Sequence, residues 1–305
     1  MKIMIFGSGG VGGYFGARLA ASGEDVRFIA RGPHLDAMRN NGLNVTSALG
    51  NAHVETVGAT DAATDCGIAD VVFVAVKLYD TDAAADAIKP AVGPDTTLVS
   101  FQNGVSGADI LSDAFGRERV IGGSSSIAAR IEKPGVIEHT GTMALLAIGE
   151  WDGQTMPRTQ DLFDACTKAG IDVTLSDHID GVIWSKFVFL AAFAGITCAF
   201  RQSIGPILED SDKRSLFKSA LEETFAIARV RGVTLPDDLV NKRMDFADGL
   251  PREMYSSMYH DLNAAKRLEL PWLSGTVADF GRELGIATPA HQSFVDALAS
   301  FIDGD

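Results

Sequence analysis

The sequence predicts an α/β protein in two parts, a doubly wound parallel sheet followed by a domain built almost entirely of helices. Two observations predict this fold. Short apolar runs alternate with amphipathic stretches through the first part of the chain, as in βαβ units. After about residue 176 the strand-like runs nearly vanish and helical spacing takes over. A chain of 305 residues is long enough for two domains, which we predict at residues 1–177 and 178–305.

The first part supplies the elements of the sheet in a regular order. Apolar runs predict strands at 2–6, 25–30, 70–76, 97–101 and 120–122, with further strand-like pieces at 136–147. Helical spacing predicts helices at 11–22, 80–88 and 108–114. The segments 44–46 and 53–57 predict a small hairpin inserted in this pattern.

The second part predicts helices at 182–200, 212–231, 237–246, 252–268, 273–284 and 289–302. The first of these is apolar enough to resemble a membrane span. It carries Lys186 near one end, and no basic cluster follows it. We therefore predict a buried core helix and no membrane segment.

Composition limits the partners that the protein can bind. The formal net charge is −14, so the chain lacks the basic surface of a nucleic-acid binder and would be repelled by anionic lipid. An anionic small molecule would need a local cationic pocket. The three cysteines are widely spaced and the six histidines lack metal-ligand spacing, so we expect no disulfide framework and no metal. We expect a cytoplasmic protein.

The segment Gly7-Ser8-Gly9-Gly10-Val11-Gly12 matches the pattern G-x-G-x-x-G. It follows a predicted strand and opens a predicted helix, which is the context that dinucleotide binding requires. Glycine permits the tight turn, the close approach of a pyrophosphate and the packing of helix on strand. The alternative is an ordinary glycine-rich turn.

The end of the second predicted strand indicates which dinucleotide binds. An NAD site has an acidic residue there to accept a hydrogen bond from the ribose 2′-hydroxyl. This chain has Ala30 and then Arg31, whose guanidinium can pair with a 2′-phosphate. We predict NADP over NAD, the alternative being that Arg31 is a surface arginine.

Lys186 is the only charged residue between Asp180 and Arg201. A lysine in so apolar a helix either extends its ammonium to water or faces a polar cleft. A desolvated lysine has a lowered pKa, which suits a proton donor near neutral pH. The spacing alone leaves both alternatives open.

Taken together and in order, these residues resemble the ketopantoate reductase family (2-dehydropantoate 2-reductase). The resemblance spans nearly the whole chain. It implies a Rossmann domain followed by a helical domain, and NADPH-dependent reduction of 2-dehydropantoate to pantoate, a step towards pantothenate. The matching elements are Gly7–Gly12, Arg31, Val76-Lys77, Gln102-Asn103-Gly104, Gly123–Ser126 with Ala128, Trp184-Ser185-Lys186, Ser256-Ser257-Met258 and Leu268-Glu269-Leu270.

The resemblance also implies a role for individual residues. Gly7–Gly12 would hold the pyrophosphate and Arg31 the 2′-phosphate. Lys186 would be the general acid and Ser257 a substrate contact. The remaining cofactor contacts would be Lys77, Asn103, Ala128 and Glu269.

The chain departs from the family pattern where substrate-binding asparagines are common. Leu190, Ala194 and Ile204 occupy those positions, and Pro271 stands where an acidic residue is usual. A pocket that loses amides loses discrimination for polar substrates. The alternative substrate is therefore a more apolar 2-oxo acid.

The sequence leaves two other functions open. One is a non-enzymatic sensor that binds NADPH, and another is a dehydrogenase of the 3-hydroxyisobutyrate type. The sensor would need no proton donor, so Lys186 and Glu269 argue against it. The helical domain could carry a homodimer interface, which the sequence does not reveal.

Overall fold

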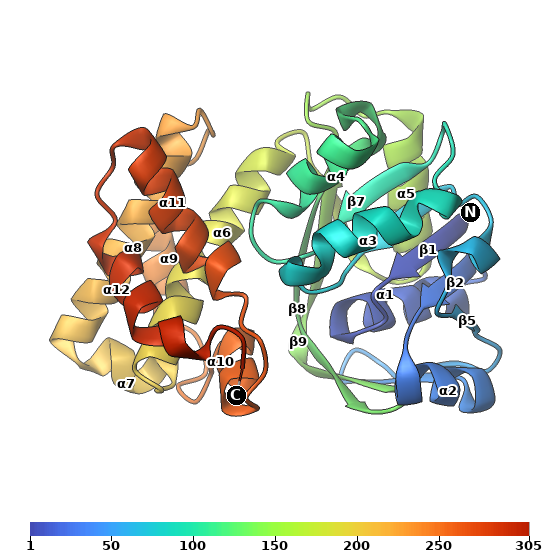
Figure 1. Ribbon diagram of the computed structural model, residues 1–305, viewed down its shortest axis with the longest axis horizontal. Helices are drawn as coiled ribbons and strands as arrows, with labels where there is room; N and C mark the ends of the chain where they lie inside the picture. The colour runs from blue at the N-terminus through green and yellow to red at the C-terminus, as the bar shows by residue number, and fades with distance from the viewer. Residues whose placement is uncertain (305) are drawn as a thin grey trace. The chain divides into compact units, whose positions relative to one another are not determined.

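The computed structural model describes residues 1–304, which form two compact units (Figure 1). The first unit comprises residues 1–102 and 106–179, and contains the sheet. The second comprises the chain from Asp180 onward together with residues 103–105. Asn103 therefore belongs to the helical unit, although it lies between two elements of the sheet unit.

Six parallel strands form the centre of the first unit, in the order β5-β2-β1-β6-β7-β8. This is the strand order of dinucleotide-binding Rossmann folds, whose ligands bind beyond the carboxyl ends of the strands. The strands are β5 (Gly58–Thr60), β2 (Asp25–Ile29), β1 (Lys2–Phe6), β6 (Val71–Val74), β7 (Thr97–Ser100) and β8 (Val120–Lys133).

An antiparallel extension makes the sheet mixed. Strand β9 (Val136–Gly149) pairs antiparallel with β8 and parallel with both β3 (Leu43–Ser47) and β10 (Asp172–Leu175). Strand β4 (Ala52–Val54) pairs with β3 as the predicted hairpin. The helices of this unit are α1 (Gly10–Ala21), α2 (Gly32–Asn41), α3 (Thr81–Ile88), α4 (Gly107–Phe115) and α5 (Pro157–Lys168).

The structure differs from the sequence prediction mainly where the chain is polar or glycine-rich. The short strand predicted at 120–122 is the first part of the 14-residue β8, whose glycines and serines hide its length. The predicted helix at 252–268 is reduced to α10 (Ser257–Asn263), because the Ser256 hydroxyl caps it by accepting a hydrogen bond from Tyr259 N–H. Helices α2, α5 and α7 (Ile204–Glu209) and the strands β5 and β10 were not predicted.

The helical unit is built around α6 (Ile179–Ala199). Among the described residues, α6 is the one helix long and apolar enough to cross a membrane, and 61% of its most apolar window is buried. Side chains of α6 lie in the core of the unit, as predicted for a core helix. The surrounding helices are α7 (Ile204–Glu209), α8 (Ser211–Val230), α9 (Leu239–Asp248), α10, α11 (Ser274–Leu284) and α12 (Pro289–Leu298).

His291 joins α12 to α8 inside this core. Its side chain is fully buried, and Nε2 lies 2.9 Å from both the Ala220 carbonyl and the Thr224 hydroxyl. A carbonyl only accepts, so Nε2 carries the proton and Nδ1, which has no partner among residues 1–304, carries none. Burial lowers the pKa of His291 to about 4, so the ring is neutral in the folded protein at neutral pH.

We expect His291 to make the protein less stable in acid. The unfolded chain takes up a proton near pH 6.5, whereas the folded chain resists until about pH 4, so stability is lost as the pH falls through this window. The loss from this one group approaches about 3 kcal/mol. Urea unfolding of wild type and His291→Gln at several pH values measures it. Equal pH dependence in the two proteins between pH 6.5 and 4 would contradict this assignment.

Candidate functional site

The turn after β1 is packed too closely for any residue but glycine at three of its positions. Gly7 has a φ of +105°, and a Cβ there would lie 2.7 Å from Val76 N. A Cβ on Gly12 would lie 2.2 Å from the Gly7 carbonyl oxygen, and one on Gly10 would lie 2.0 Å from the carbonyl oxygen of Ala129. The glycines therefore allow α1 to press against β1 and allow β8 to pass over the start of α1.

Gly9 is different, because a Cβ added to it would have no atom within 4 Å. It is the N-cap of α1 and has no side chain to satisfy the free N–H groups of the first helical turn. These N–H groups and the positive end of the helix dipole favour an anion at this point. The geometry is that of a helix N-terminus with an open approach, as a pyrophosphate site requires.

A hollow of about 230 Å³ adjoins the turn. Arg31 lines it as the N-cap of α2, and its side chain is exposed. No acidic residue stands at the end of β2, although Asp80 lines the hollow from beyond β6. The predicted glycine turn and Arg31 therefore lie at one cavity. The other lining residues are Phe6, Ile29, Ala30, His34, Val76, Ala83, Ala84 and Ile131.

His34 also lines this hollow, and the sequence analysis did not identify it. Its Nε2 donates to the Ser8 carbonyl at 3.0 Å, and its Nδ1 accepts from Gly135 N–H at 3.1 Å. Burial lowers the pKa of His34, which keeps the ring neutral as both contacts require. The ring thus connects the glycine turn to the turn between β8 and β9. The sequence feature that could have identified His34 is its position one helical turn after Arg31.

Two further predicted cofactor contacts belong to the sheet unit. Lys77 follows β6 and precedes a short 3₁₀ turn at Leu78–Asp80. Ala128 lies exposed in β8, beside the irregularity where Ala129 passes over Gly10. Lys77 therefore lies at the carboxyl end of a central strand, and Ala128 lies where β8 comes close to α1.

The helical unit brings three other predicted residues together. Lys186, on α6, is half-buried and its ammonium donates a hydrogen bond to Asn103 Oδ1 at 3.2 Å. Burial lowers the pKa of Lys186 to about 8, against an opposing rise from the negative charge of Glu269. Glu269 is only 2% exposed. The result is an ammonium that can release its proton near neutral pH, oriented by an amide oxygen.

The remaining predicted positions in this unit separate into exposed and buried ones. Ser257 is exposed at the first position of α10, whereas its neighbour Ser256 is buried and hydrogen-bonded to Thr197. Ala194 and Ile204 are at most 1% exposed and pack in the core, so they cannot present a polar or an apolar surface to a ligand. Leu190 is the partly exposed one of the three apolar replacements.

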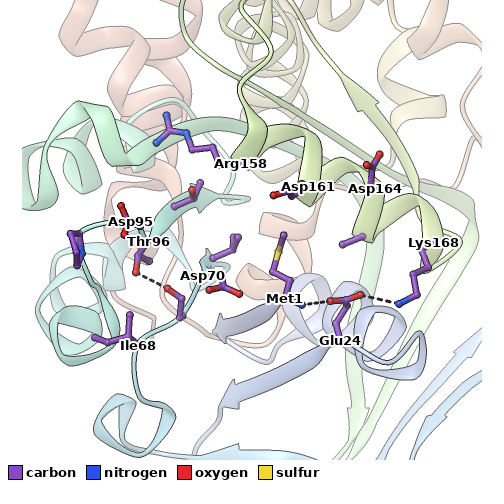
Figure 2. Close-up of a pocket in the computed structure, with 15 residues that line it drawn as sticks. Met1, Glu24, Ile68, Asp70, Asp95, Thr96, Arg158, Asp161, Asp164 and Lys168 are labelled. Carbon is purple, nitrogen blue, oxygen red and sulfur yellow. Dashed lines mark hydrogen bonds and ion pairs between the residues drawn. The ribbon is translucent and has the colours of Figure 1, made fainter.

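A larger hollow of about 720 Å³ lies elsewhere in the sheet unit (Figure 2). Figure 2 shows Glu24 between the amino group of Met1 and the ammonium of Lys168. Asp70 and Thr96 line it just before β6 and β7, which places it at the amino ends of the strands. It is therefore distinct from the glycine-turn cavity, because Rossmann ligands bind at the opposite edge. Among residues 1–304, no cluster of His, Cys, Asp and Glu could hold a metal ion.

Comparison with known proteins matches both units to one family. The model described as "Ketopantoate reductase PanE/ApbA" matches residues 3–153, and its C-terminal counterpart matches residues 178–301. The chain belongs to the ketopantoate reductase family. As a family member it is an oxidoreductase of the 2-dehydropantoate 2-reductase type, as the resemblance predicted.

Several relatives of the family are similar over their full length. The 2-dehydropantoate 2-reductase of Mesorhizobium japonicum is 30% identical, covering 99% of this chain and 97% of its own. The uncharacterized oxidoreductase YkpB of Bacillus subtilis is 31% identical over 95% of both chains. The crystal structure of 2-dehydropantoate 2-reductase from Geobacter metallireducens has a TM-score of 0.92 at 29% identity, covering 98% of this chain and 99% of its own. D-mandelate dehydrogenase, solved with NADH, shares the fold at 20% identity and a TM-score of 0.89.

We expect alanine substitutions at two glycines of the turn to separate folding from binding. Gly9→Ala should keep the melting temperature near that of wild type, because its Cβ has space, but should weaken dinucleotide binding by filling the open approach. Gly12→Ala should lower the melting temperature, because its Cβ meets the Gly7 carbonyl. Thermal denaturation and dinucleotide titration measure the two effects. Destabilisation by Gly9→Ala with unchanged binding would refute this division of roles.

Proposed function

We propose that this family member reduces a 2-oxo acid with NADPH, and that 2-dehydropantoate is the substrate and pantoate the product. The observation that carries the proposal is Lys186, an ammonium of lowered pKa hydrogen-bonded to Asn103 in an otherwise apolar helix. The chemistry of ketone reduction needs such a group, because negative charge develops on the ketone oxygen.

In this reaction Lys186 has two tasks. Its ammonium stabilises the charge that grows on the ketone oxygen, and then transfers one proton from Nζ to that oxygen. Bound NADPH would supply the hydride that reduces the ketone carbon, leaving NADP⁺. Asn103 orients the ammonium, and the carboxylate of Glu269 keeps it protonated until the reaction needs the proton. The neutral amine regains a proton from solvent.

Residues of the sheet unit are proposed to hold the phosphates of the cofactor. The N–H groups at Gly10–Gly12 would bind the pyrophosphate, and Arg31 would pair with the 2′-phosphate of NADPH. Ser8 supports the turn by donating its hydroxyl to the Ile29 carbonyl at 2.7 Å. The other proposed cofactor contacts are Lys77, Asn103, Ala128 and Glu269. The proposed substrate contacts are Lys186 and Ser257.

A more apolar 2-oxo acid is the second candidate substrate. Leu190 lies one helical turn beyond Lys186, is partly exposed, and stands where substrate-binding asparagines are common in the family. The buried Ala194 and Ile204 offer no compensating polar group. A surface of this kind favours a branched or longer hydrocarbon chain on the 2-oxo acid.

The proposal includes a cytoplasmic setting and a small-molecule substrate. A relative from Staphylococcus aureus, 22% identical, is described as a dimeric ketopantoate reductase. A homodimer is accordingly the assembly that we propose to test by mass measurement in solution.

A panel of 2-oxo acids tests the proposed activity. We expect NADPH oxidation with 2-dehydropantoate or a branched-chain 2-oxo acid, and a fall in kcat of about 10²- to 10⁴-fold in Lys186→Ala, because the proton donor is lost. The ratio of kcat/KM for the two substrates decides between the candidates. No turnover of any 2-oxo acid would favour a sensor, and an undiminished Lys186→Ala would overturn the assignment of Lys186 as the proton donor.

The activity should fall as the pH rises through about 8, because only the protonated form of Lys186 can donate. Glu269→Gln removes the charge that raises the pKa of Lys186, so the alkaline limb of the profile should move to lower pH. The profile of kcat/KM against pH measures both effects. An alkaline limb that does not move in Glu269→Gln would disagree with this coupling.

Arg31 should decide the preference for NADPH. We expect Arg31→Ala to weaken NADPH binding about 10- to 100-fold, as for loss of a charged hydrogen bond. NADH binding should change little, since NADH has no 2′-phosphate. Titration of both dinucleotides into both proteins measures the ratio. A wild-type preference for NADH would overturn the assignment of Arg31.

A further inference from the structure

Helix α9 carries an arginine that lacks an acidic partner. Arg243 Nη2 donates a hydrogen bond to Ser185 Oγ at 2.6 Å. Its Nε is buried and has no partner among residues 1–304, which also provide no ion pair for it. Burial lowers the pKa of Arg243, and no nearby carboxylate offsets that effect. A hydroxyl is thus the single protein group that this half-buried cation contacts by a hydrogen bond.

Most arginines of this chain, whose net charge is −14, pair with a carboxylate. Arg18 shares the buried, unpartnered Nε, but its Nη2 donates to the Gly50 carbonyl, whereas the contact of Arg243 is a hydroxyl. Arg214 on α8 makes two hydrogen bonds of 2.7 Å to the carboxylate of Asp248, at the end of α9. Arg229, also on α8, pairs with Asp237. Removing a charge from water without a partner is unfavourable, and a guanidinium offers a planar fork that fits a carboxylate. Arg243 is therefore a guanidinium that could bind an anion and has no carboxylate partner within the described residues.

The position of Arg243 relates it to the proposed proton donor. Val182, Ser185, Lys186 and Leu190 have the spacing i, i+3, i+4, i+8 and share one face of α6. All four are partly exposed, whereas Phe187 and the following Val188 are buried. The guanidinium contacts this face at Ser185, next to Lys186 in the chain. The guanidinium of Arg243 and the ammonium of Lys186 are thus both associated with this partly exposed face of α6.

Aromatic packing holds α9 in this position. Phe246 lies one turn after Arg243 and meets Phe189, one turn after Ser185, edge to face with ring centroids 5.0 Å apart. Phe189 also stacks on Phe193 at 5.3 Å. The hydrogen bond to Ser185 and this aromatic contact occur on the same sides of the two helices. The arginine is therefore held by packing on the side of α6 that carries Lys186.

We propose that Arg243 binds the carboxylate of the 2-oxo acid while Lys186 engages its ketone oxygen, with Ser185 positioning the guanidinium. The inference rests on the proposed function and deepens it, because it names the group that selects an acid. A carboxylate would accept hydrogen bonds from the Nη donors that the contact with Ser185 leaves unused, and its charge would balance the guanidinium whose Nε is buried. This contact would also provide recognition in a chain whose Leu190, Ala194 and Ile204 supply no amides.

The test compares a 2-oxo acid with its methyl ester, which keeps the ketone but lacks the negative charge. In wild type we expect kcat/KM for the acid to exceed that for the ester by about 10²-fold or more. Arg243→Gln should abolish most of this preference, chiefly by raising KM for the acid, and should leave the ester unchanged. Ser185→Ala should reduce the preference partly. Added guanidinium ion should restore activity on the acid to Arg243→Gln.

Two controls keep the outcome unambiguous. Arg214→Gln removes a guanidinium that also contacts α9 but already has a carboxylate partner, so it should leave the acid-to-ester ratio unchanged. Arg243→Lys keeps the charge without the planar fork, and should fold and show an intermediate ratio even if Arg243→Gln is unstable. An acid-to-ester ratio equal to wild type in a folded Arg243→Gln or Arg243→Lys would overturn the proposal.

Failure of the proposed function would give a different result. If wild type turned over no 2-oxo acid, the binding site would still be tested with oxamate, an unreactive analogue of a 2-oxo acid. We expect oxamate to raise the melting temperature of wild type and of Arg214→Gln, and not that of Arg243→Gln. Equal stabilisation of all three proteins, or of none, would contradict the carboxylate site itself.

Discussion

The proposed chemistry of this protein depends on the cost of burying an ammonium group. Lys186 sits near the start of a helix whose other residues mostly form a hydrophobic core, and that setting lowers its pKa to about 8. Asn103 supplies an oxygen for the ammonium and Glu269 a balancing negative charge. A weaker desolvation would leave the lysine permanently protonated, and a stronger one would deprive it of its proton. The apolar character of α6 is therefore part of the proposed catalytic site.

A second constraint acts through close packing of backbone. The glycine turn after β1 is approached by backbone of β8 and of the residues just after β6, at distances that admit no side chain. The same packing leaves Gly9 open to the outside, at the positive end of α1. His34 adds a polar connection from this turn to Gly135. One compact arrangement of backbone thus both stabilises the sheet unit and prepares an anion site.

Most of the basic side chains of this protein have an acidic partner. The chain carries 40 acidic and 26 basic residues, and many of its arginines are paired with carboxylates. Arg31 and Arg243 are two of the arginines without an ion pair among residues 1–304, and each lies where the proposed reaction would bring an anion. Others, such as Arg201 and Arg231, lie over aromatic rings. In an acidic protein, a local cation without a carboxylate partner provides the positive charge that a negative ligand needs.

The sequence by itself determined the two-part organisation, the glycine turn, the absence of an acidic residue after β2, and the isolated lysine of α6. These features depend on neighbouring residues, through helical and strand periodicity and the conformational freedom of glycine. The length of β8, the helices α2 and α5, and the contacts of His34 and Arg243 could not be predicted in this way. The place of Asn103 in the helical unit could not be predicted either, nor could the burial of Ala194 and Ile204 in the core of that unit. Only the tertiary structure decided them, because each depends on which distant segments pack together and which polar atoms are left without a partner.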